Sequence, residues 1–436
     1  MVRTVVGGLV IAAVAMLAAN APAQENWPQW RGADQSNIAA TADPPVTWSE
    51  TENIVWKTPL PSWSGGSPIV WGDRVYLMSP SKPGESKEEQ ETGGSKLLLL
   101  CISKADGKVL WEHELAEGNK LGNKQNMTSP TPVTDGQHLW TITGMGILTA
   151  LDMDGKELWK KDIQQLFGKI GLQFGYASSP VLYGGNVIIQ MQHGFFTDEP
   201  CYIAAFDGLT GELRWRVERP TTAVIEGPDA YNTPTLLKVN DKTQIILSGG
   251  DCVTGHDADT GREIWRAWGL NPRHGQYNRI IPSVAVGGGM AFASSRVKPL
   301  IAVRADGEGD VTETHTAWVW DKVGSPDVPT PICDGTHLYM VDDGTRVTKV
   351  DIKTGTAVWG PKRAGEGIVS ASPLLAAGRI YFTNEEAVTY VVSAGPEYTL
   401  LATNTLDVSK TLSSFAVSGN QLFLRTATHL YCIGKK

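Results

Sequence analysis

The sequence contains few cysteines, and their spacing does not match a metal or haem site. There are five in 436 residues, an odd number, with neither a C-x-x-C pair nor the C-x-x-C-H haem motif. They are Cys101, Cys201, Cys252, Cys333 and Cys432. Because Cys101 and Cys432 align with the small Ala205 of another repeat, we interpret the cysteines as packing residues. The alternative is a disulfide formed in an oxidising compartment, although no spacing favours a particular pair of cysteines.

The chain has fewer basic than acidic residues, and it lacks the common catalytic motifs. The formal net charge is -8, which argues against nucleic acid or an anionic membrane surface as the main partner. There is no nucleophile elbow or phosphate loop. The histidines share no metal-binding spacing, and we predict no metal site. Two acidic stretches, Asp152–Gly155 and Asp342–Gly344, look like fragments of calcium loops but lack the later ligands, so we interpret them as turns.

Long apolar runs are absent except at the N-terminus. Arg3 is followed by an apolar stretch from Val5 to Ala19 and by the small-x-small pattern Ala21-Pro22-Ala23. This predicts a signal peptide over residues 1–23, cut after Ala23, and hence a periplasmic or secreted protein without a membrane span. The alternative, an uncleaved anchor, is disfavoured because the run is short and no basic stop signal follows it.

What the sequence does contain is a repeat of four short strands, best seen from Tyr176 to Trp215. Each repeat starts at a Ser/Thr-Pro pair and ends at Gly-x-x-x-Trp, with turn residues between the strands. The starts are Ser67, Thr131, Ser179, Thr233, Thr330 and Ser372, with degenerate copies at Ser283 and Ser414. The final tryptophans are Trp111, Trp159, Trp215, Trp265 and Trp359, and Trp318 or Trp320 fills the gap. A spacing of about 40 to 55 residues is typical of a four-stranded propeller blade.

We therefore predict an all-β, eight-bladed β-propeller of four-stranded antiparallel blades over residues 53–436. The C-terminal run from Ser414 to Ile433 holds only three strands, while Asn53–Leu60, with Trp56, resembles a fourth strand that lacks its blade. Pairing the two would close the last blade with the N-terminal strand and remove a sheet edge. Residues 24–52 are predicted to form an arm that lies on the propeller, and the polar stretch Ser81–Ser95 to form a solvated loop.

The repeat resembles that of the PQQ-type (quinoprotein) β-propeller family. The residues that carry the resemblance are Ala205, Asp207, Thr210-Gly211 and Trp215, and the pattern recurs around Trp265 and Trp359. The resemblance covers nearly all of the mature chain and is closest to secreted bacterial PQQ-repeat proteins. It implies that the tryptophans lie between blades and that the Asp and Thr-Gly residues organise the hairpin turn. The tryptophans concerned are Trp56, Trp111, Trp159, Trp215, Trp265, Trp318 and Trp359.

The resembling family includes both enzymes and binding proteins. Its dehydrogenases use pyrroloquinoline quinone (PQQ) with a calcium ion held by Glu, Asn and Asp, and most of the alcohol dehydrogenases carry adjacent cysteines; its assembly factor BamB binds proteins without a cofactor. This chain has no adjacent cysteines and is shorter than those enzymes. We therefore expect an exported, monomeric, non-catalytic platform that binds an envelope protein or a small ligand, without a cofactor. The alternative is a PQQ-dependent oxidoreductase acting on alcohols or sugars, and a hydrolase or lyase on the propeller rim is a third reading.

Polar and aromatic residues precede the Ser/Thr-Pro starts. In a propeller these loops lie on one face around the channel, so we predict a ligand-binding rim there. Its residues are Gln125, Asn126, Tyr176, Tyr231, Asn232, Arg279 and Asp327, with an acidic corner at Asn384 and Glu385. The alternative is a hydrated channel mouth held by hydrogen bonds between blades.

Overall fold

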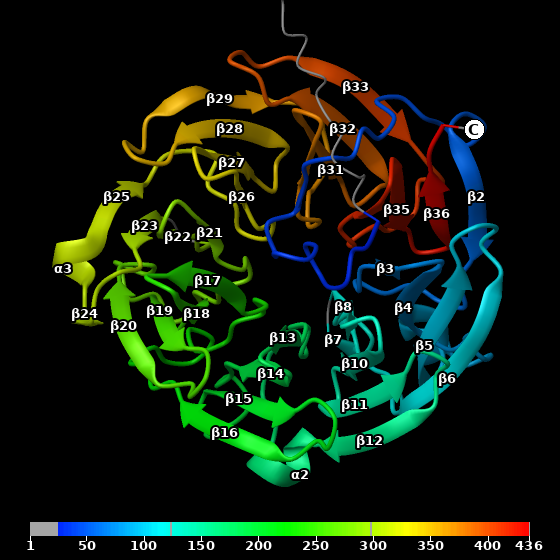
Figure 1. Ribbon diagram of the computed structural model, residues 1–436, viewed down its shortest axis with the longest axis horizontal. Helices are drawn as coiled ribbons and strands as arrows, with labels where there is room; N and C mark the ends of the chain where they lie inside the picture. Colours follow the sequence, from blue (N-terminus) through cyan, green and yellow to red (C-terminus); the bar gives the residue numbers. More distant parts are fainter. Residues whose placement is uncertain (1–24, 123, 297–298, 436) are drawn as a thin grey trace, which may run out of the picture.

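The computed structural model describes residues 25–122, 124–296 and 299–435; the predicted signal peptide lies outside them. Eight antiparallel sheets are arranged radially around a central axis (Figure 1). The predicted all-β, eight-bladed propeller is therefore confirmed.

The first four blades follow one another along the chain, each running from its innermost to its outermost strand. Blade 1 consists of β3 (Ile69–Trp71), β4 (Arg74–Pro80), β5 (Lys96–Ser103) and β6 (Val109–Glu117). Blade 2 consists of β9 (Val133–Thr134), β10 (His138–Ile142), β11 (Ile147–Asp152) and β12 (Glu157–Asp162). Blade 3 consists of β13 (Val181–Tyr183), β14 (Asn186–Met191), β15 (Tyr202–Asp207) and β16 (Leu213–Glu218). Blade 4 consists of β17 (Thr235–Val239), β18 (Lys242–Gly249), β19 (Cys252–Asp257) and β20 (Glu263–Trp268).

The other four blades complete the circle. Blade 5 consists of β21 (Ala285–Gly287), β22 (Met290–Ala293), β23 (Leu300–Arg304) and β25 (Thr316–Trp320). Blade 6 consists of β26 (Ile332–Cys333), β27 (His337–Val341), β28 (Arg346–Asp351) and β29 (Ala357–Arg363). Blade 7 consists of β30 (Leu374–Ala376), β31 (Arg379–Thr383), β32 (Val388–Ser393) and β33 (Leu400–Thr405). Blade 8 consists of β34 (Ala416–Ser418), β35 (Gln421–Arg425), β36 (His429–Ile433) and β2 (Ile54–Pro59).

Short elements decorate this ring. β1 (Ile38–Ala39) pairs in parallel with β30, β24 (Gly309–Asp310) pairs in parallel with β20, and β7 (Leu121–Gly122) pairs with β8 (Gln125–Asn126). The helices are α1 (Lys87–Thr92), α2 (Ile163–Phe167) and α3 (Thr312–His315). The stretch Ser81–Ser95, predicted to be a loop, thus contains α1, which forms because the Ser86 hydroxyl accepts the Glu89 N–H at its N-terminus.

The two ends of the propeller meet in blade 8. β2 pairs antiparallel with β36, with Thr58 opposite Leu430, and the N–H of Leu60 donates to the carbonyl of Thr428 (2.9 Å). Figure 1 shows the blue β2 beside the red β36 at the rim. The predicted closure by the N-terminal strand is confirmed, and β36 is no longer an edge strand of the last blade.

The outermost strand of every blade except blade 7, which has Leu400 and Leu401 at this place, carries a tryptophan near the boundary with the next blade. A β-bulge just before Trp159 places its indole opposite the small Ala150. Its N–H donates to the carbonyl of Gly208 in blade 3 (2.9 Å). Gly211 (φ 69°) faces the same indole, and a Cβ there would lie 2.7 Å from it, so only glycine fits this turn. Cys101 and Cys432 occupy the position opposite Trp111 and Trp56, which is the packing site predicted for them.

The innermost strands are joined by a closed cycle of hydrogen bonds. At the start of each blade a serine or threonine hydroxyl accepts the backbone N–H of the corresponding residue of the preceding blade, at 2.8 to 3.0 Å. We call these residues the hydroxyl ring; they are Ser67, Thr131, Ser179, Thr233, Ser283, Thr330, Ser372 and Ser414. The cycle runs through all eight blades and links blade 8 back to blade 1.

Candidate functional site

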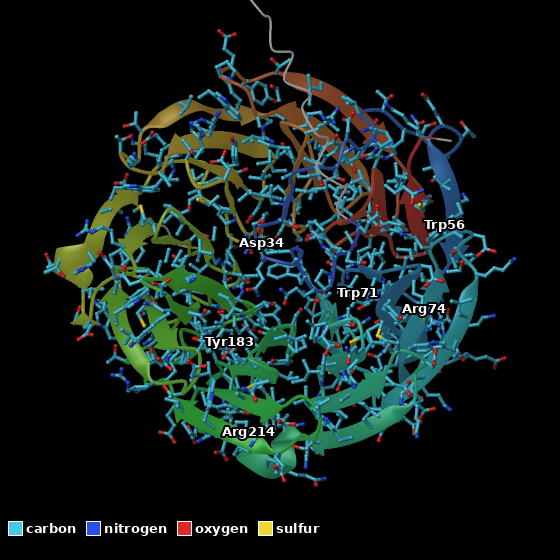
Figure 2. All side chains as sticks on the ribbon, viewed as in Figure 1. Asp34, Trp56, Trp71, Arg74, Tyr183 and Arg214 are labelled. Carbon is cyan, nitrogen blue, oxygen red and sulfur yellow. The ribbon has the colours of Figure 1, made fainter. Side chains whose placement is uncertain are left out.

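The N-terminal arm covers one end of the channel, which we call the arm face. Trp27 pairs with Val70 of blade 1, and Gln35 donates to the carbonyl of Pro234 in blade 4 (2.7 Å). On the same arm the Arg31 guanidinium donates to the carbonyl of Pro331 in blade 6 (3.1 Å). Figure 2 shows Asp34, in this arm, near the centre of the ring, whereas Trp56 lies in its outer wall. The arm thus touches blades on opposite sides of the axis.

A small cavity of about 110 Å³ lies on the axis next to the arm, and we call it the axial cavity. All eight members of the hydroxyl ring line it, and Trp30 of the arm lines it as well. A second set of residues, two positions earlier in each blade, also lines it, as expected for alternation in an extended strand. These residues are Gly65, Ser129, Ala177, Tyr231, Ile281, Val328, Ser370 and Leu412.

The opposite end of the channel opens into a larger cavity of about 250 Å³, which we call the mouth cavity. It is bounded by the loops that enter the innermost strands and by those that join the second and third strands of a blade. Its apolar wall is formed by Phe174, Ile281, Val328, Ile368 and Leu412. Its polar wall is formed by Lys124, Gln125, Tyr231, Arg279, Asp327, Asp343 and Ser370.

The two cations of the mouth cavity are each paired with a glutamate. Arg279 lies 3.3 Å from the nearly buried Glu226 and stacks over the ring of Phe174, 4.7 Å from its centroid. Lys124 lies 2.6 Å from Glu385, which also accepts the Ser370 hydroxyl. These pairs hold both side chains in place at the cavity wall.

The two aspartates of the mouth cavity are not paired in this way. Asp343 accepts the backbone N–H groups of Asp327 and Val328, both at 3.1 Å. Burial, reinforced by the Asp327 carboxylate beside it, raises the pKa of Asp343 to about 6. Burial also raises the pKa of Asp327, against the attraction of Arg279. One carboxylate oxygen of Asp327 is buried and has no hydrogen-bond partner among the described residues, so a polar ligand could supply one.

The structure brings together five of the nine predicted rim residues. Gln125, Tyr231, Arg279 and Asp327 line the mouth cavity, and Glu385 lies behind it, bonded to Lys124. Two further residues of the mouth cavity, Lys124 and Asp343, are not among the predicted rim residues. The acidic turn at Asp343 is visible in the sequence, but nothing there shows that it reaches the channel mouth.

The other four predicted rim residues lie in the interior. Tyr176 is 1% exposed and donates its hydroxyl to the Gln190 carbonyl (3.0 Å). The side chains of Asn126, Asn232 and Asn384 are buried and donate to backbone carbonyls of neighbouring loops. These asparagines link neighbouring segments through hydrogen bonds. This is the role that the alternative interpretation, a channel mouth held by hydrogen bonds between blades, gives them.

The lining of the mouth cavity does not contain the Glu, Asn and Asp set that holds calcium in the quinoprotein dehydrogenases. Such a site needs several oxygen ligands around one ion. Across residues 25–122, 124–296 and 299–435, no three His, Cys, Asp or Glu side chains lie close enough to hold a metal ion. The mouth cavity is lined by two carboxylates, Asp327 and Asp343, but by no asparagine or glutamate, and Asp343 already accepts two backbone N–H groups.

Taken with the repeat tryptophans and the closed ring, this geometry defines a PQQ-type β-propeller with a cavity at the mouth of its channel. The profile of one protein family, described as outer membrane protein assembly factor BamB, matches residues 95–360 and 248–396. These matches span well over half of the chain, and the protein belongs to this family. No curated protein matches the sequence.

Solved structures with a similar fold include a BamB protein, an alcohol dehydrogenase and a computational design. BamB from Moraxella catarrhalis is 14% identical with a TM-score of 0.57, over 86% of this chain and 97% of its own. The quinohemoprotein alcohol dehydrogenase from Comamonas testosteroni is 11% identical with a TM-score of 0.65, over 96% and 82% respectively. The computationally designed protein Ika8 is 11% identical with a TM-score of 0.60, over 87% and 99%. At this level of identity the likeness establishes the fold, and function has to be argued from the surface.

Proposed function

We propose that this protein is an exported, non-catalytic platform of the cell envelope that binds a partner protein through the face that carries the mouth cavity. Membership of a family described as an assembly factor supports a protein partner. The BamB-like fold is in keeping with a place in the envelope. No helix in the part of the chain that the structure describes could span a membrane.

The observation that carries the proposal is the uneven distribution of exposed apolar side chains between the two faces. We call the side of the propeller that carries the mouth cavity the mouth face. The segments that connect blade strands on this face present nine large apolar side chains, each with 40 to 66% of its surface exposed. They are Leu121, Leu166, Phe196, Val224, Ile225, Tyr277, Val323, Ile368 and Val408. The turns of the arm face present only Leu209 among the described residues, and the remainder lie on the outermost strands.

A partner that covers the mouth face would account for this difference between the two faces. Large exposed apolar groups that gather on one face mark protein interaction sites. Aromatic side chains such as Phe196 and Tyr277 supply much of the binding energy at interfaces. The mouth cavity lies within this face and offers a pocket in which a partner side chain could be anchored.

A pair of cross-linking positions tests the proposal. We expect a photo-reactive residue at Phe196 or Tyr277 to label the same single protein in envelope extract of the source organism. The same residue at Leu209, which is 64% exposed on the arm face, should label nothing specific. Equal labelling from both faces, or a product with the mass of two copies of this chain, would contradict the proposal.

Substitution then links the labelled protein to the face. Phe196→Ser with Ile368→Ser should weaken the purified complex by at least about tenfold, because each removes an exposed apolar contact of roughly 1 kcal/mol or more. Leu209→Ser is the matched control and should leave affinity unchanged. Reduction of a dye with alcohols or glucose, after incubation with PQQ and calcium, would favour the oxidoreductase reading instead.

A further inference from the structure

The hydroxyl ring holds eight O–H donors for which the described residues provide no acceptor. Each hydroxyl oxygen already accepts an N–H from the preceding blade, so its own proton must point in another direction. No ring hydroxyl donates a hydrogen bond to any described residue. All eight residues line the axial cavity, and none is more than 5% exposed. Eight buried donors therefore converge on one small space.

The wall of the axial cavity offers little to satisfy these donors. It contains no carboxylate among the described residues, and its single amide, Gln125, can turn either its oxygen or its nitrogen inwards. A cation site would need carboxylate or carbonyl oxygens aimed at the ion. The donor-rich wall is instead suited to an acceptor, which means water or an anion.

A buried cation beside the axial cavity favours the anion. Arg31 is 2% exposed and forms no ion pair within 4 Å; Asp34 acts on it only at longer range, and its Nε and Nη1 atoms are buried without a hydrogen bond. It lies 5.6 Å from the ring centroid of Trp30, which lines the cavity. Its Nη2 atom bonds the carbonyl of Pro331, the residue next to Thr330 of the hydroxyl ring. An unpaired buried charge is costly, and a nearby ion of opposite sign offsets that cost.

From these contacts we propose that the hydroxyl ring binds a small monovalent inorganic anion of the halide class on the propeller axis. The volume of about 110 Å³ accommodates one such ion with a few waters, since a water occupies roughly 30 Å³ in the liquid. The ring hydroxyls are neutral and Arg31, with Asp34 at longer range, supplies at most one compensating charge, so the site suits a monovalent ion and not a multivalent one. Because the ring includes a residue from every blade, the bound ion stabilises the closed circle.

Bromide is the probe for the crystallographic test, because its anomalous scattering separates it from water. Crystals of the mature chain soaked in bromide should show an anomalous peak on the axis, within hydrogen-bonding distance of the ring hydroxyls. If the axial density shows no anomalous signal, or bromide appears only on the outer surface, the cavity holds water alone and the proposal fails.

A solution measurement uses a matched pair of variants. Thr233→Val removes one ring hydroxyl at almost constant shape, whereas Thr141→Val removes a buried hydroxyl outside the ring that has no hydrogen-bond partner. At constant ionic strength the Tm of the wild type and of Thr141→Val should rise with bromide concentration. The apparent bromide affinity of Thr233→Val should be about tenfold weaker or worse, the usual effect of losing a hydrogen bond to a charged group.

An equal bromide response in all three proteins would overturn the proposal. Thr233→Val also removes the acceptor of the Ser179 N–H, and if this variant does not fold, the wild-type crystals decide the question. The axial and mouth cavities share lining residues such as Tyr231 and Leu412, but no hydroxyl-ring residue lines the mouth cavity, so the bromide test and the cross-linking test can fail separately.

Discussion

Replacing Trp56 by alanine measures how much the N-terminal strand contributes to the closed ring. Trp56 is 9% exposed, contacts Phe423 with ring centroids 5.9 Å apart, and donates its N–H to the carbonyl of Lys104 (2.8 Å). Removing a buried tryptophan side chain costs about 3 to 5 kcal/mol because a cavity remains and packing is lost. We expect a loss of this size in the free energy of unfolding of Trp56→Ala.

Trp159→Ala is the matched control, because its environment within the chain is nearly the same. Trp159 is also 9% exposed, and its N–H donates to the carbonyl of Gly208 (2.9 Å), but it lies between blades that are consecutive in sequence. If the closure through β2 is as tight as an internal interface, the two variants should lose stability equally, to within about 1 kcal/mol.

Urea unfolding followed by far-UV circular dichroism supplies the measurement. The midpoint should fall in both variants while the slope of the transition stays close to that of the wild type. A loss below about 1 kcal/mol for Trp56→Ala beside a loss of about 3 to 5 kcal/mol for Trp159→Ala would refute the reasoning. It would mean that the pairing of β2 with β36 adds little to the stability of the propeller in solution.

Three further outcomes follow from the same structure. Gly355→Ala should lower the free energy of unfolding by about 1 to 3 kcal/mol more than Gly378→Ala in thermal or urea melts. The φ angles of the two glycines are 68° and 69°, but a Cβ at Gly355 would lie 2.7 Å from the Trp318 indole, whereas a Cβ at Gly378 would meet nothing within 4 Å. Equal losses in the two variants would contradict the tight packing at Gly355. Asp343→Asn should reduce the fall in Tm between about pH 4 and about pH 6. The pKa of Asp343 in the folded state is raised from 3.8 to about 6, so the folded state holds the proton more tightly and stability is lost as pH rises through this window. An unchanged pH profile would contradict the burial of this carboxyl. All five cysteines are free and buried in the structure, so a thiol reagent should label none of them in the native protein and all of them after unfolding, and rapid native labelling would count against it.

The fold was predictable because its determinants are local and repeated. The turn glycines and the tryptophan of each repeat act within one blade or on the next, so their spacing alone marks the blades. The strand around Trp56 could be assigned to blade 8 because three strands without a fourth leave an open edge. Cys101 and Cys432 could be placed because the repeat aligns them with Ala205.

The candidate site was predictable only in part, because its residues come from loops without a period. The sequence placed Gln125 and Asn126 on the same rim, yet one side chain lines the mouth cavity and the other is buried among backbone carbonyls. The acidic turn at Asp343 looked like any exposed turn, and its raised pKa arises from burial against a loop that ends at Asp327. The side chains of residues adjacent in sequence point to different places here, because contacts with neighbouring blades set the conformation of each loop.

By itself, the sequence determined the number of blades, their order and the closure, since each depends on strand length, turn chemistry and pairing between neighbours. Only the tertiary structure decided that Ser283 and Ser414 are full members of the hydroxyl ring although their proline is misplaced or missing. The physical reason is that the hydroxyl oxygen accepts the N–H of the preceding blade, a bond that exists only once eight strands meet around one axis. The same convergence brings Trp30 of the arm to the axial cavity, from a segment that carries no repeat.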